Sequence, residues 1–163
     1  MDKILNLDKL SAEYSQNMVA ENKNKADVLE KVVTKSLGVL QEQGIYAMML
    51  FLFSRSTNDE KIVAGSIRRQ FYLFLTQLPD FKKNEDLAKL DMVTQKKPED
   101  NDEKKKEKVR QELEKGLKFY STNIMDNYDT LFLVRNIYEQ TLIYARYGAK
   151  ALLKESKNVP ESV

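Results

Sequence analysis

The sequence has no cysteine and no histidine among its 163 residues. Without cysteine, the chain cannot form disulfides, use a thiolate nucleophile or build the common zinc sites. Without histidine, it lacks the usual general base near neutral pH, serine–histidine catalysis and the histidine ligands with which helix bundles hold two irons. The lack of cysteine also suits a reducing compartment, and we expect a cytoplasmic protein.

Glycine and proline are scarce, with five and three residues, and no stretch shows sustained strand alternation. Apolar residues recur instead every three or four positions. A chain of this length can bury a core of ordinary size. The pattern predicts an all-α fold, a single domain over residues 1–163 built as a bundle of about six helices. The predicted helices span residues 5–21, 26–43, 45–53, 59–78, 107–124 and 128–156.

The longest apolar run covers residues 45–53, about half of what a bilayer span needs. We therefore expect a buried helix at the centre of the bundle and no association with a membrane. Gly44, directly before this run, is expected to cap the preceding helix in a left-handed conformation. Charged residues interrupt the first ten positions, so no secretion signal is expected.

Carboxylates are the remaining candidates for metal chemistry. Asp126 and Asp129 are three residues apart but lie in an apparent turn, and Glu139 is the only acid in its long helical pattern. Helical metal sites repeat their carboxylates on two facing elements. We therefore expect no enzymatic activity, no metal and no cofactor, although a carboxylate-only magnesium enzyme stays as an alternative.

Residues 80–106 are strongly polar, with eight lysines and eight acidic residues. Such a segment buries too little apolar area to offset its ordering entropy unless a neighbour covers it. We expect a charged surface insert, partly mobile. The tail is expected to fray from about residue 157 through Pro160.

The net charge is 27 − 25 = +2, which is too small to indicate nucleic-acid binding by itself. The distribution of charge is more informative, because residues 134–154 contain a single acid, Glu139. The cations of this stretch are Arg135, Arg146, Lys150 and Lys154. A cation-rich helix face attracts phosphates or acidic partners.

Three apolar residues, Phe132, Ile143 and Tyr147, fall within the polar arc of the same helical pattern. A monomer gains nothing from exposing them, and a partner could cover them. The face is therefore interpreted as a binding surface, with a solvated face carrying scattered apolar residues as the alternative.

Two blocks of sequence resemble one family. Residues 44–55, GIYAMMLFLFSR, follow an amphipathic helix, and residues 138–153, YEQTLIYARYGAKALL, form the closing helical pattern. Both are similar to blocks of the small α-helical subunit of the Cmr (type III-B) CRISPR RNA-targeting effector complex. The opening residues 10–15, LSAEYS, fit the first helix of that family.

The resemblance implies a non-catalytic structural subunit that stacks in several copies as a minor filament. Its partners would be backbone subunits that hold the guide RNA, the large signalling subunit and further copies of itself, and the filament would line the channel for target RNA. Whether it touches guide or target RNA directly is left open. The alternatives are the equivalent small subunit of a Csm (type III-A) complex and a stand-alone helical adaptor or nucleic-acid-binding protein.

RNA backbone that is bound without sequence readout requires positive charge along a groove. The candidate RNA-binding residues are the cations on predicted helices: Lys31, Lys35, Arg55, Arg68, Arg69, Arg135, Arg146 and Lys150. Arg146 and Lys150 come first, because they share one stripe and lie within a matching block. For each cation, the alternative is a solvated side chain or an ion pair within the molecule.

Overall fold

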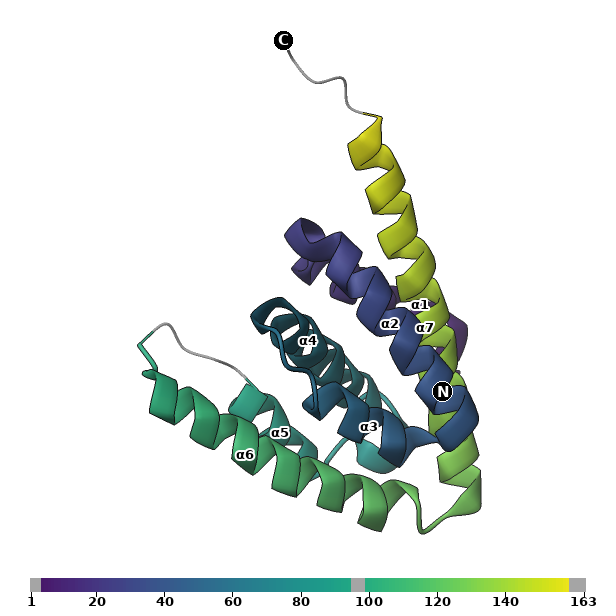
Figure 1. Ribbon diagram of the computed structural model, residues 1–163. Helices are drawn as coiled ribbons and strands as arrows, with labels where there is room; N and C mark the ends of the chain where they lie inside the picture. The colour runs from purple at the N-terminus through teal and green to yellow at the C-terminus, as the bar shows by residue number, and fades with distance from the viewer. Residues whose placement is uncertain (1–3, 95–98, 159–163) are drawn as a thin grey trace.

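The computed structural model describes residues 4–94 and 99–158. These residues form an all-α bundle of seven α-helices (Figure 1), which confirms the predicted fold class with one helix more than expected. The helices are α1 (Leu7–Glu21), α2 (Ala26–Gln43), α3 (Ile45–Phe53), α4 (Asn58–Leu75), α5 (Glu85–Thr94), α6 (Asp102–Phe119) and α7 (Tyr128–Lys157). Short turns of other helix types are η1 (Lys23–Lys25), η2 (Pro79–Phe81) and the π-helical η3 (Tyr120–Ile124).

The longest helix, α7, packs along both α1 and α2, and its C-terminal part extends beyond the rest of the bundle (Figure 1). Asn127 begins it as N-cap, because its side chain accepts a hydrogen bond from the backbone N–H of Thr130. The helix reaches Lys157, and Pro160 of the predicted frayed tail lies outside the described residues. Its buried face follows the helical period of the sequence: Val134, Ile137, Tyr138, Thr141, Leu142, Ala145 and Ala149.

The apolar helix α3 packs against α2, α4 and α6. Met48, Met49 and Leu52 are buried, but Leu50 is 42% exposed. The expectation of a helix buried on every side was therefore wrong, because three neighbouring helices leave one side of α3 open to solvent. No helix in residues 4–94 and 99–158 is both long and apolar enough to cross a membrane.

In the charged segment at residues 80–106, the structure describes residues 80–94 and 99–106, which include helical elements packed against the bundle. The segment contains α5, which packs against α4 and α6 and buries Leu87 and Leu90, while Phe81 of η2 is buried beside them. The predicted start of the next helix at residue 107 was also wrong. Helix α6 begins at Asp102, because the side chain of Asn101 caps it by accepting from the N–H of Lys104 at 2.8 Å. The few apolar residues of α5 are buried because this helix packs against both α4 and α6.

Gly44 joins α2 to α3 with φ 94° and ψ −176°. This positive φ confirms that the position needs glycine, although ψ differs from that of the usual left-handed cap. The conformation is accessible almost only to glycine. A Cβ at Gly44 would meet no atom within 4 Å, so any cost of a side chain there comes from the backbone alone.

Replacing Gly44 by alanine should therefore lower the free energy of unfolding by about 1 to 2 kcal/mol. Gly38 is a matched control, since it lies inside α2 and also has nothing within 4 Å of a built Cβ. Gly38→Ala should stabilise the protein by about 0.5 to 1 kcal/mol. Urea denaturation of the two variants measures both effects, and equal changes in the two would contradict this reading of the junction.

Candidate nucleic-acid interface

The closing-helix stripe consists of Arg135, Arg146 and Lys150, which lie on one side of α7. Arg135 is half-buried, and its Nη2 donates to the carbonyl of Gln41 at the end of α2 at 2.9 Å. Arg146 is half-buried and Lys150 is exposed. Neither Arg146 nor Lys150 has a side-chain hydrogen bond or ion pair with any residue that the structure describes. The two leading candidates are therefore ordered on a long helix and unneutralised.

Each of the two arginines of the closing-helix stripe has one donor atom that is buried. The Nε atoms of Arg135 and Arg146 are buried and have no hydrogen-bond partner among the described residues. A guanidinium has five N–H donors and no acceptor, so an unpaired donor can be satisfied only by an added acceptor. The Nη donors of Arg146 are the atoms that an approaching phosphate could use.

Helix α2, which packs along α7, carries two exposed lysines, Lys31 and Lys35. Lys35 has no side-chain partner in the described ranges, while Lys31 lies 3.7 Å from the carboxylate of Glu60. The Lys31 side chain is exposed, whereas that of Glu60 is largely buried, so this lysine already has an acidic partner within the molecule. The only acid of the α7 stretch, Glu139, accepts a hydrogen bond from Gln41 at 2.7 Å. The Glu139 carboxylate therefore lies beside the C-terminal end of α2, which Arg135 also contacts.

The three apolar residues of the polar arc have different surroundings. Phe132 is 57% exposed and Tyr147 is 65% exposed, as expected for residues that a partner could cover. Ile143 instead packs against the hydrophobic core, so its assignment to the open face was wrong. Phe132 and Tyr147 are thus the exposed aromatic residues of this surface.

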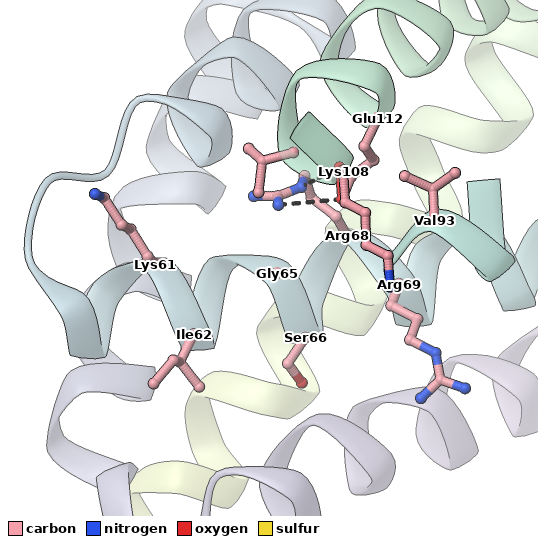
Figure 2. Close-up of a pocket in the computed structure, with 10 residues that line it drawn as sticks. Lys61, Ile62, Gly65, Ser66, Arg68, Arg69, Val93, Lys108 and Glu112 are labelled. Carbon is pink, nitrogen blue, oxygen red and sulfur yellow. Dashed lines mark hydrogen bonds and ion pairs between the residues drawn. The ribbon is translucent and has the colours of Figure 1, made fainter. Parts of the chain in front are cut away.

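Arg68 lies elsewhere, at the seam between α4 and α6 (Figure 2). Its Nε and Nη2 donate to the two carboxylate oxygens of Glu112 at 2.6 and 3.2 Å, and its Nη1 donates to the carbonyl of Leu52 at 3.2 Å. The guanidinium also covers the ring of Phe53 at 4.2 Å from the centroid. Arg68 is only 6% exposed. It holds the fold together, and we remove it from the candidate RNA-binding set.

The other two predicted arginines of this region are partly engaged. Arg69 pairs with Asp91 at 3.0 Å. Arg55 donates to the carbonyl of Phe51 at 3.0 Å and stacks on the ring of the same residue at 3.7 Å. Both side chains are half-buried and keep further donors, but they lie on α4 and after α3 rather than on α7. The structure thus places these arginines apart from the closing-helix stripe of α7.

Sequence reasoning missed Lys105 and Lys106, which lie along the seam between α4 and α6. Two hollows lie along it, and both are lined by Lys61, Arg68 and Val109. The hollow nearer α3 also has Lys105 and Lys106 in its lining. Those two lysines were assigned to a polar insert, because a run of lysines and acids is typical of a solvated segment. Only the docking of α5 and α6 places them opposite α4.

Behind the seam lie three buried tyrosines. The hydroxyl of Tyr72 donates to the Glu112 carboxylate at 3.2 Å, and the hydroxyls of Tyr120 and Tyr138 are 2.6 Å apart. Burial raises the pKa of all three phenols above the ordinary value, and for Tyr72 the neighbouring Glu112 charge raises it further. The π-helical turn η3 places Tyr120 against α7. The Tyr72 hydroxyl therefore connects α4 to α6, and the Tyr120–Tyr138 pair connects η3 to α7.

The raised phenol pKa values predict that stability falls at alkaline pH. The unfolded chain releases these protons near pH 10, whereas the folded chain keeps them, so rising pH favours the unfolded state. The three tyrosines together should lower the free energy of unfolding by about 1 kcal/mol between pH 8 and pH 10. Urea denaturation at several pH values measures this. Tyr138→Phe should reduce the pH dependence of the free energy of unfolding, while the same change at exposed Tyr128 should not. The same pH dependence in both variants would contradict this prediction.

The described residues contain no group of three or more acidic side chains that could hold a metal ion. Asp126 and Asp129 flank the N-cap of α7, with Asp129 in its first turn. Comparison with known proteins adds no assignment: no family model matches the chain, and no curated protein or solved structure matches it.

Proposed function

We propose that this protein is a non-catalytic small structural subunit of a type III-B (Cmr) CRISPR effector complex. Copies of it would stack as a minor filament beside the guide-RNA backbone and line the channel for target RNA. The observation that supports the proposal best is the pair Arg146 and Lys150. Both lie in the block that resembles the family, and both are held on α7 without a side-chain partner among the described residues.

The arrangement suits contact with an RNA backbone without sequence readout. Arg146 and Lys150 supply positive charge about one helical turn apart, and Lys35 adds a further exposed cation from α2. Exposed Tyr147 follows Arg146 directly and offers an aromatic face on which an unpaired base can stack. Phe132 lies four turns earlier on the same helix and is available to a protein neighbour. The proposed role needs no catalytic group on this chain.

The same features suit two related roles. The equivalent subunit of a Csm (type III-A) complex would use a basic helical face in the same way. A stand-alone helical adaptor would bind nucleic acid or protein without a larger particle. A gene flanked by backbone-subunit genes and a repeat array supports the effector-complex roles, and the identity of those neighbours separates type III-B from type III-A.

The direct test is to recover the full-length chain with an affinity tag from cells that carry the rest of the system. We expect particles of cytoplasmic origin that contain guide RNA, backbone subunits and more than one copy of this chain. Recovery of the chain alone, with no guide RNA and no other subunit, would contradict the proposal and favour the stand-alone role. Turnover of RNA by the purified chain, abolished by a point substitution within it, would contradict its non-catalytic part.

A further inference from the structure

The hollow nearer α3 has an unusual charge balance. Its eight lining residues include five cations and no acid: Leu52, Phe53, Arg55, Lys61, Arg68, Lys105, Lys106 and Val109. Its volume is about 260 Å³. Arg68 at its base is neutralised by Glu112. Four unneutralised positive charges therefore line this hollow.

The three lysines of this hollow are free to bind. The ammonium groups of Lys61, Lys105 and Lys106 have no hydrogen bond or ion pair with any residue in the described ranges. Elsewhere on α6, Lys104 pairs with Asp100 at 3.2 Å and Arg110 pairs with Glu107 at 2.9 Å. Lys105 and Lys106 are thus left unneutralised among the described residues, although Lys104 and Arg110 of the same helix pair with acids. Like charges this close repel one another, and a bound anion would relieve the repulsion.

The rest of the lining is apolar. Leu52 is buried, Phe53 is half-buried, and Val109 is 38% exposed. The lining of the hollow therefore suits a ligand that has an anionic end and a flat or apolar part. Inorganic phosphate would use the cations but not these walls. A long acidic peptide would need a groove of greater length than this hollow.

We propose that this hollow binds one nucleotide through a terminal phosphate, with the base against the apolar walls. A phosphate monoester carries about −1.5 to −2 charge near neutral pH, whereas a phosphodiester within a strand carries one. Four unneutralised cations in one small space favour the more highly charged group. The shared chemistry is a nucleotide with a terminal phosphate, which is either free in solution or the end of an RNA strand.

This site lies at the α3, α4 and α6 side of the bundle, and none of its lining residues belongs to α2 or α7. It is therefore independent of the proposed contact of α7 with RNA. Substitutions in the hollow leave Arg146 and Lys150 in place, so the failure of one proposal leaves the other standing.

The test measures binding of ATP, AMP, adenosine and short RNAs with a 5′-phosphate or a 5′-hydroxyl to the full chain. We expect ATP and AMP, or the 5′-phosphorylated RNA, to bind, and adenosine and 5′-hydroxyl RNA to bind at least about tenfold more weakly. Binding of ATP and AMP identifies a free nucleotide as the source. Binding of the 5′-phosphorylated RNA alone identifies a strand end.

Lys105→Glu with Lys106→Glu should weaken that binding by at least about tenfold. The control is Lys115→Glu with Lys118→Glu, which makes the same charge change on exposed lysines farther along α6 and should change binding by less than about twofold. If the glutamate pair fails to fold, Lys105→Gln with Lys106→Gln replaces it. No binding of any phosphate-bearing probe, or equal loss in test and control variants, would overturn the proposal. Adenosine binding as tightly as AMP, together with equal binding of the two RNAs, would also overturn it.

Discussion

Replacing Glu112 by alanine should lower the free energy of unfolding by about 3 to 5 kcal/mol. The substitution removes the carboxylate that binds two donors of Arg68 and accepts from Tyr72. Arg68 is 6% exposed, so its charge would be left buried without a counter-charge. Breaking one side of a buried pair costs far more than the pair itself contributes.

Urea denaturation measures this loss, and two further variants define its cause. Arg68→Met combined with Glu112→Leu should recover much of the stability, because apolar side chains of similar size replace a buried pair at little cost. Glu107→Ala removes an exposed ion pair with Arg110 on the same helix and should change stability by less than about 1 kcal/mol. A double variant as unstable as the single one would show that the loss does not come from the stranded charge.

Reversing Arg146 and Lys150 to glutamate should weaken retention of target RNA by the assembled complex on the order of 100-fold at low salt. Two contacts with phosphate are lost, and two negative charges are added to the face. Each lost phosphate contact also lowers the salt dependence of binding, because fewer counterions are released. Filter binding or anisotropy across a salt series measures both quantities.

The control for this pair is again Lys115→Glu with Lys118→Glu, which changes the net charge by the same amount on a different helix. It should leave both the affinity and the salt slope nearly unchanged. Equal losses in the two double variants would mean that net charge alone attracts the RNA. Unchanged retention by the α7 variant at low and high salt would contradict the choice of this face.

The parts of the fold that follow from local pattern could be predicted from the sequence. The apolar period of α7 gave its buried face, and the position of Gly44 gave the junction between α2 and α3. The packing of α5, within the charged segment, could not be predicted in this way. It depends on tertiary contacts, because α4 and α6 pack against α5 and bury Leu87 and Leu90.

The candidate sites show the same limit. Arg146 and Lys150 are exposed or half-buried and unpaired, which their place on the polar side of a helical pattern already favoured. Arg68 lies on a helix that also carries the unpaired Lys61, but its partner Glu112 is 44 residues away. No local signal in the sequence distinguishes such an arginine from a solvated one. The hollow beside Lys105 likewise exists only once α6 docks near α4.

Photo-crosslinking is the most direct test of the claim that α7 lines a path for RNA. A target RNA with photoreactive uridines would be bound to the complex that contains this chain, and crosslinked peptides would be identified by mass spectrometry. We predict crosslinks on this chain at Tyr147 and the residues beside it, on the exposed side of α7. Crosslinks to other subunits with none on α7, or crosslinks on this chain confined to other helices, would contradict the account.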